Sequence, residues 1–120
     1  MTASPIALNA APTTVDFTNP GTSTWGSVAL KEEGSKMLLW AGDTGFDGIV
    51  QYVGENNDRD GILVAIGGSV PTNVVNGVYT NLDVNLDGSI RYVGEFNDRD
   101  LILQAIGGTL PTATRHQQVP

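Results

Sequence analysis

Residues 83–100 read DVNLDGSIRYVGEFNDRD, and residues 43–60 read DTGFDGIVQYVGENNDRD. The match continues without a gap, so that 19 of the 30 residues at positions 43–72 are identical to those forty positions later. Chance does not produce such agreement, and the chain therefore contains a duplicated unit. The duplication kept carboxylates, glycines, the Asn-Asp-Arg-Asp run and the apolar positions that follow it.

Each copy opens with an acidic loop. In the second copy, Asp83, Asn85 and Asp87 precede Gly88 in the pattern of a calcium loop, where positions 1, 3 and 5 supply side-chain oxygens and position 6 is glycine. Ser89 would supply its backbone carbonyl at position 7. Carboxylates held close together repel one another unless a cation lies between them. Calcium takes about six to eight hard oxygen ligands, so this loop predicts a Ca²⁺ site.

The first copy predicts a second Ca²⁺ site with Asp43, Asp47 and the carbonyl of Ile49. Gly45 stands where the second copy has Asn85, so this site lacks one side-chain ligand and would be weaker or recruit water. A twelve-residue loop would end at glycine in both copies. We therefore expect a lengthened loop, closed by one or both aspartates at the start of the next helix. These residues are Asp58 and Asp60 in the first copy, and Asp98 and Asp100 in the second. Helix capping alone is the other interpretation of these aspartates.

Short strands and helices are expected around the loops. Residues 49–53 and 89–93 are β-prone. Asn57 and Asn97 are suitable N-caps for helices whose apolar faces cover residues 61–66 and 101–106, and a Gly-Gly pair ends each helix. Helices of about nine residues are not stable alone and must pack against something.

Four β-prone runs occur in the first forty residues, at 5–10, 14–18, 27–31 and 37–40. They could form a small sheet on which the two helices pack. The sequence thus predicts an α+β fold, with a β-rich segment at 1–40 and EF-hand-like calcium units at 41–80 and 81–120. We expect the three parts to form one compact domain.

The most N-terminal run has no obvious local partner. Ile6, Ala7 and Leu8 form its centre, and it is separated from the next run by Ala10-Ala11-Pro12. It is either an edge strand or a donor segment, residues 4–11, that completes the sheet of a neighbouring subunit. Head-to-tail contacts of the second kind do not close and give filaments, so a homo-oligomer or filament is a hypothesis from this run.

Composition excludes several classes of function. The formal charge is −7 with thirteen carboxylates against six Lys and Arg, which disfavours binding to nucleic acid or to an anionic membrane surface. There is no cysteine and only one histidine, so thiolate metal sites and a Ser-His-Asp triad are not expected. No apolar run is long enough for membrane insertion. The N-terminus lacks the features of a signal peptide, so an exported protein would be seen here as its mature chain.

The doubled motif resembles the tandem EF-hand-like calcium modules of dockerins. It is most similar to the dockerin-like modules of large secreted hemagglutinin- or adhesin-type proteins of the Bacteroidetes, in which such loops run into Asn-Asp-Arg-Asp and then Ile-Leu-x-x-Ile-Gly-Gly. The similarity covers residues 39–118 and extends loosely over residues 12–38. The resemblance implies an extracellular or cell-surface location, calcium dependence, and an adhesive or assembly role without catalysis.

The sequence therefore favours a calcium-binding structural or adhesive protein, a surface or self-assembling subunit made rigid by two Ca²⁺ ions. The alternatives are a dockerin-type docking module of a larger secreted protein, which would bind another cell-surface protein, and a carbohydrate-binding adhesin domain. The acidic pairs do not suit a glycosidase, because both members lie in one loop. We expect the protein not to be an enzyme.

Overall fold

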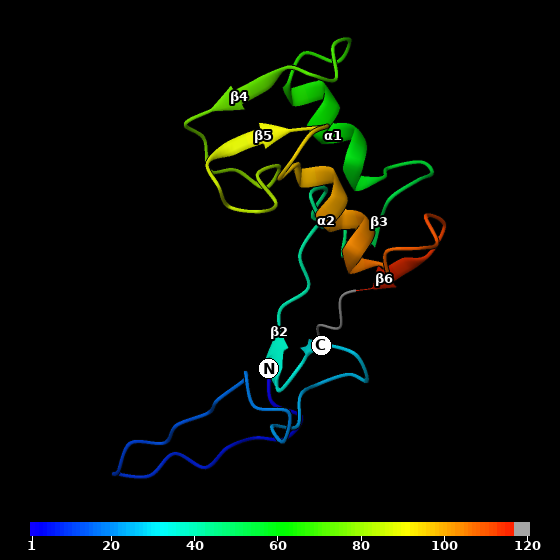
Figure 1. Cartoon of the computed structure of the whole chain (residues 1–120). Coiled ribbons are helices and arrows are strands. Elements are labelled where there is room, and N and C mark those ends of the chain that lie inside the picture. The colour runs from blue at the N-terminus through cyan, green and yellow to red at the C-terminus, as the bar shows by residue number, and fades with distance from the viewer. Residues whose placement is uncertain (117–120) are drawn as a thin grey trace. The chain divides into compact units, whose positions relative to one another are not determined.

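The computed structural model describes residues 1–116 and has a mixed α+β fold of short elements (Figure 1). The chain divides into two compact units, Met1–Trp40 and Ala41–His116, which we call the N-terminal unit and the repeat unit. The sequence suggested one compact domain, whereas the structure has two units with the boundary where the first repeat begins. The last four residues of the predicted segment 81–120 lie outside the described part.

The repeat unit contains six short elements in the same order in each repeat. The first repeat has β3 (Ile49–Gln51), α1 (Asp58–Ala65) and β4 (Val74–Asn76), and the second has β5 (Ser89–Arg91), α2 (Asp98–Ala105) and β6 (Thr114–His116). The predicted strands are thus confirmed in their first three residues only. Gly54 and Gly94, with φ of 108° and 97°, turn the chain soon after each strand.

The strands pair between repeats rather than within them. β3 pairs with β6, and β4 pairs with β5, both antiparallel (Figure 1). Each repeat therefore supplies the closing strand for the other repeat's loop strand. The two helices contact each other and both contact β3 and β5. The sequence analysis did not predict β4 and β6, whose partners lie in the other repeat.

Both helices begin and end where the sequence predicts. Asn57 caps α1 by accepting the Asp60 backbone N–H at 3.0 Å, and Asn97 does the same for α2. At the other end of α1, Gly67 adopts a φ of 110° and the Gly68 N–H donates to the Leu63 carbonyl at 2.8 Å. A positive φ costs glycine little, so the Gly-Gly pair ends each helix after eight residues.

All buried apolar side chains among residues 1–116 lie in the repeat unit. Its buried apolar residues come from the two helices and the two loop strands: Val50, Ile62, Ile66, Ile90, Ile102, Ala105 and Ile106. Gly42 also faces this core, since a Cβ there would lie 3.3 Å from atoms of Val50 and Ile102. The helices thus pack on strands of their own unit.

The N-terminal unit contains only one two-stranded sheet, β1 (Lys31–Glu33) and β2 (Lys36–Leu38). The predicted strands at 5–10 and 14–18 do not form, and the nearest element to the first is a single bridge between Thr2 and Thr24. Side-chain hydrogen bonds explain part of the difference. Asp16 accepts the Thr18 N–H at 2.9 Å and Asn19 accepts the Gly21 N–H at 2.8 Å, so these backbone donors are satisfied in local turns.

No helix among the described residues has the length and apolar character needed to span a membrane.

The core position of Ile62 gives the first testable prediction. Ile62 is fully buried on α1, whereas Val64 on the same helix is 71% exposed. We expect Ile62→Ala to lower the free energy of unfolding by about 2–5 kcal/mol because it leaves a cavity. Val64→Ala, the matched control, should change it by less than about 0.5 kcal/mol. Chemical denaturation measures both, and equal effects would contradict this assignment of the core.

Candidate metal centre

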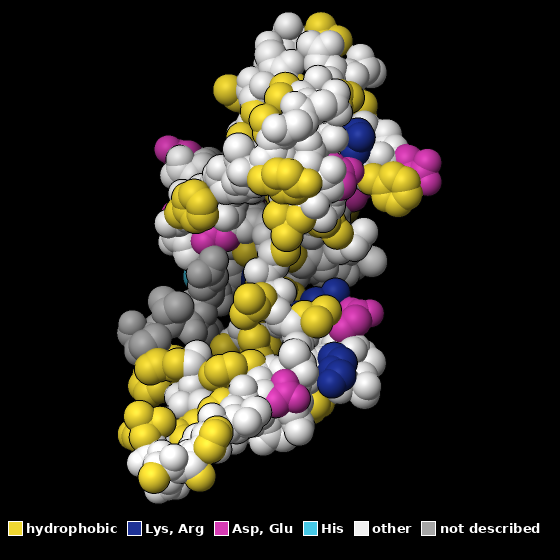
Figure 2. Space-filling model, turned by 90° about the vertical axis from the view of Figure 1, so that its left-hand side faces the viewer, with side chains coloured by type: hydrophobic (Ala, Val, Ile, Leu, Met, Phe, Trp, Pro, Cys, Tyr) yellow, Lys and Arg dark blue, Asp and Glu magenta, His cyan; other side chains and the backbone are white. Residues whose placement is uncertain are grey.

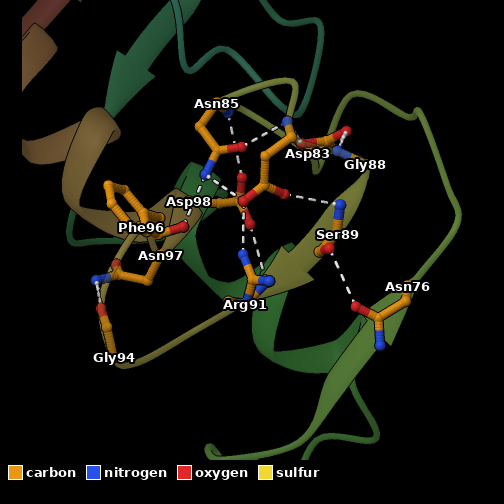
Figure 3. Close-up of polar contacts among 11 residues, drawn as sticks. Asn76, Asp83, Asn85, Gly88, Ser89, Arg91, Gly94, Phe96, Asn97 and Asp98 are labelled. Atoms are coloured by element: carbon orange, nitrogen blue, oxygen red, sulfur yellow. Dashed lines mark hydrogen bonds and ion pairs between the residues drawn. The ribbon is translucent and has the colours of Figure 1, made fainter.

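The acidic loop of the second repeat is folded around the carboxylate of Asp83 (Figure 3). This carboxylate accepts the backbone N–H groups of Asp87 and Gly88, both at 3.0 Å. Asp83 is 1% exposed. The first residue of the predicted calcium loop therefore already holds the loop closed, and Gly88, with a φ of 82°, makes the turn that brings these N–H groups inward.

A second buried carboxylate reaches the same loop from the helix that follows it. Asp98 is the first residue of α2 and has no exposed surface. One oxygen accepts the Asn85 N–H at 3.2 Å, the other accepts the Arg91 N–H at 2.8 Å, and the Val84 N–H is also a donor to this group. Asp98 thus joins the start of α2 to both ends of the loop.

The pKa of Asp98 is raised, chiefly because burial disfavours its charged form. Its hydrogen bonds from the backbone N–H groups act in the opposite direction, and the nearby negative charge of Asp83 raises the pKa further. Asp83 and Asp98 are therefore close enough to repel each other. Among residues 1–116, neither of them forms an ion pair with Lys or Arg.

The first repeat builds the same arrangement independently. Asp43 accepts the N–H groups of Asp47 and Gly48 at 3.2 and 3.0 Å. Asp58, the first residue of α1 and 2% exposed, accepts from Thr44, Gly45 and Gln51 at 2.7–3.1 Å. Its pKa is also raised, mainly by burial and in part by the charge of Asp43.

Of each predicted pair of closing aspartates, only the first points into the loop. Asp60 instead accepts a hydrogen bond from the Asn57 side chain at 2.8 Å and forms an ion pair with Arg59 at 3.3 Å. Asp100 makes the corresponding contacts with the side chains of Asn97 and Arg99. The capping interpretation therefore describes Asp60 and Asp100, whereas Asp58 and Asp98 lie at the loop.

The remaining candidate residues of the second loop are bonded to their neighbours. Asn85 accepts the Asp87 N–H at 2.8 Å, and its side-chain amide donates to the Phe96 carbonyl at 2.7 Å (Figure 3). Asp87 accepts the Ser89 N–H at 2.9 Å and forms an ion pair with Arg91 at 2.5 Å. The Ser89 hydroxyl points away from the loop and donates to Asn76 on β4.

The pKa of Asp87 is lowered, although partial desolvation acts to raise it, because the hydrogen bond from Arg91 and the Ser89 N–H outweigh that effect. The first loop lacks this ion pair. Gln51 stands where the second repeat has Arg91 and donates to the Glu55 carbonyl at 2.6 Å, while Asp47 accepts the Ile49 N–H at 2.8 Å. Gly45 contributes no side chain.

Two further side-chain contacts were missed in the sequence. Arg59 lies over the ring of Tyr52 at 5.1 Å, and Arg99 lies over that of Tyr92 at 5.0 Å, so each helix start is also braced by a cation–π contact. The repeated Tyr and Arg, seven positions apart, were the available signal. The signal for the ion pair between Asp87 and Arg91 was a pair of opposite charges four residues apart, which occurs in the second copy but not in the first.

Among residues 1–116, no three Asp, Glu, His or Cys side chains are gathered as a ready-made metal site. In each loop two of the three aspartates, Asp43 and Asp58 or Asp83 and Asp98, accept backbone N–H groups of the same repeat. A carboxylate has about four lone-pair positions. The N–H groups named above use two on Asp83 and three on Asp98, so both groups keep acceptor capacity for a cation.

Comparison of the chain with protein-family models, with curated proteins and with solved structures found no match. The resemblance to dockerin-like modules therefore rests on the motif residues alone and stays a prediction.

The second prediction follows from the different positions of Asp98, which reaches the loop, and Asp100, which lies at the helix cap. Asp98→Asn should remove about 2.7 kcal/mol of stabilisation at calcium concentrations a hundredfold above Kd, because the second loop loses a charged ligand. Without calcium, Asp98→Asn should also lower the free energy of unfolding by about 1–3 kcal/mol, since a backbone N–H loses its acceptor. Asp100→Asn, the control at the cap, should keep the full calcium response.

Chemical denaturation of each variant with calcium and with chelator measures the loss of stability under both conditions. A full calcium response in Asp98→Asn, or its loss in Asp100→Asn, would contradict the assignment of Asp98 to the loop.

Proposed function

We propose that this chain is a calcium-binding structural protein in which each acidic loop holds one Ca²⁺ ion. The observation that carries the proposal is the buried carboxylate pair of the second loop. Asp83 and Asp98 lie almost wholly out of solvent and repel each other, and neither forms an ion pair with Lys or Arg in the described chain. Burial of such a charge is costly unless a cation compensates it.

The chemistry of the available donors favours calcium over other metals. In the second loop they are oxygens of Asp83, Asn85, Asp87 and Asp98, with the carbonyl of Ser89 as a further ligand. Calcium accepts such mixed oxygen donors in flexible geometry and about six to eight at a time, whereas Mg²⁺ prefers near-ideal octahedral sites and keeps its waters. The first loop offers Asp43, Asp47, Asp58 and the carbonyl of Ile49, and therefore fewer side-chain ligands.

In this proposal the loops are EF-hand-like but longer, closed by Asp58 and Asp98 rather than by the twelfth residue. The metal would link the start of each loop to the first residue of the following helix. Two such links would stiffen the repeat unit, whose core contains only seven buried apolar residues. The role is thus structural rather than catalytic: an extracellular or cell-surface subunit whose rigidity depends on calcium and which associates with copies of itself.

A docking module of a larger secreted protein is a second candidate, because large apolar side chains project from the acidic loops. Phe46 and Leu86, at the same position of the two loops, are 78% and 71% exposed and have φ near 60°. Bulky residues in this conformation are uncommon, and exposed apolar side chains at a loop tip suit contact with a protein partner.

The test of calcium binding is thermal unfolding of the full chain with Ca²⁺, with EGTA, and with EGTA plus excess Mg²⁺. When the Ca²⁺ concentration is a hundredfold above Kd, two sites together add about 5 kcal/mol to the free energy of unfolding. For a domain of this size we expect the melting temperature to rise by about 10 °C or more with Ca²⁺ and not to be restored by Mg²⁺. Equal melting with calcium and with chelator would overturn the proposal.

Arg91 provides a further prediction, because its guanidinium pairs with the proposed ligand Asp87. Arg91→Gln introduces the residue that the first repeat has at this position. We expect calcium to bind the second loop about 1.4- to five-fold more tightly, since the metal no longer has to displace an ion pair that contributes roughly 0.2–1 kcal/mol.

Isothermal titration calorimetry measures the change, with Arg99→Gln as the matched control because Arg99 pairs with the capping Asp100. Weaker binding in Arg91→Gln would show that Arg91 orients Asp87 for the metal instead of competing with it.

A further inference from the structure

The N-terminal unit lacks a core of its own. Among residues 1–40 no side chain is buried, whereas the repeat unit has seven buried apolar residues. Large apolar side chains stay at the surface, including Phe17 (40% exposed), Trp25 (46%) and Leu39 (82%). Its one sheet is a two-stranded hairpin, which is marginal without further strands or packing. Exposed apolar surface of this kind marks an interaction site.

Phe17 and Leu39 line an open groove of about 740 Å³, and all of its described lining residues belong to the N-terminal unit. Its walls include Met1, Phe17, Leu30, Met37, Leu39 and Trp40. None of the described residues that line it has a charged side chain. Figure 2 shows many apolar side chains on the surface of this unit, at the bottom of the view.

The same unit also has an extended segment that forms no regular secondary structure. Residues 4–11, which we call the arm, read SPIALNAA and carry no charged side chain. The arm contains no helix or strand, and no hydrogen bond among the described residues involves it. Ile6 is 41% and Leu8 88% exposed. Figure 1 shows the arm, in dark blue, as an extended trace running out from the rest of its unit.

We propose that the arm of one copy fills the apolar groove of a second copy. In an extended chain Ile6 and Leu8 point to the same side, so both can enter the groove while the backbone of the arm pairs with the receiving unit. Each copy would then supply the strand and apolar side chains that its neighbour lacks. This inference rests on the self-association in the proposed function, and not on calcium binding.

Charge argues for a second copy as the occupant. The chain carries a formal charge of −7, so most surfaces of two copies repel each other. Neither the arm nor the groove has a charged side chain, and they can meet without bringing carboxylates into contact.

The position of the arm disfavours the groove of its own chain. The arm starts after Thr2, which bridges to Thr24, and Ala3 donates to the Ser23 carbonyl at 3.0 Å. Met1 and Thr24 both line the groove. The arm therefore begins at the wall of its own groove and is held leading away from it. Arm-to-groove contacts between copies repeat head to tail and extend into filaments unless they close.

Mixing two defective variants tests whether the contact joins different copies. Leu8→Asp spoils the arm and leaves the groove intact, whereas Leu39→Lys spoils the groove and leaves the arm intact. Light scattering after size exclusion, with the full chain over a concentration series, should show assemblies for the wild type and monomers for each variant alone. An equal mixture should give particles of twice the chain mass, since one productive contact is restored.

Leu110→Asp is the matched control, because Leu110 is an exposed leucine (60%) of the repeat unit, outside both arm and groove. It should assemble like the wild type. Circular dichroism of each variant establishes that the fold is retained, and electron microscopy shows whether the wild-type assemblies are filaments.

A wild-type chain that is monomeric at the highest concentrations would overturn the proposal, as would unchanged assembly of Leu8→Asp. Variants that stay monomeric when mixed would show that the arm acts within its own chain, which also overturns it. Each measurement is made with Ca²⁺ and with EGTA alongside the melting temperature. If the wild type assembles but its melting temperature does not respond to calcium, the calcium sites alone are rejected. If the melting temperature responds to calcium but the wild type does not assemble, the arm contact alone is rejected.

Discussion

The repeat unit depends on one interaction that occurs twice, the buried aspartate at the first residue of each helix. Asp58 and Asp98 each accept two backbone N–H groups from the preceding loop and one from the strand that follows it. The position also suits a negative charge, because the first turn of a helix is the positive end of its dipole. One side chain thus fixes the loop, the loop strand and the helix start together. Its cost is a buried charge beside a second carboxylate, and this cost is the physical reason to expect a cation in the loop.

The exchange of strands between repeats makes the two loops parts of one structure. Val50 and Ile90 lie in the strands that follow the loops, and both are buried against the paired helices. Each of these strands is completed by the last strand of the other repeat. A rearrangement of one loop would therefore disturb the core that holds the other. Duplication here produced a single folding unit, because neither repeat contains both strands of any of its pairs.

Local chemistry determined which features could be predicted from the sequence. The helices were predictable because Asn57 and Asn97 cap them and glycines end them within a few residues. β4 and β6 were not predicted, because their partners lie in the other repeat. Val74 and Val75 of β4 are β-prone, whereas the Thr-Arg-His sequence of β6 carries little strand signal. The choice between Asp58 and Asp60 was also open, since only the fold determines which carboxylate turns toward the loop. In the first forty residues, the side chains of Asp16 and Asn19 favour turns over the strands that the β-prone residues suggested.

The chain separates its charge from its exposed apolar surface, and this separation connects the two proposals. Ten of the thirteen carboxylates lie in the repeat unit, while the N-terminal unit has Asp16, Glu32 and Glu33 against Lys31 and Lys36. Repulsion between copies therefore arises mainly from the repeat units. Two bound calcium ions would offset four of the seven excess negative charges. Calcium would then stabilise each subunit and also lower the electrostatic cost of bringing subunits together, although no calcium ligand takes part in the contact between arm and groove.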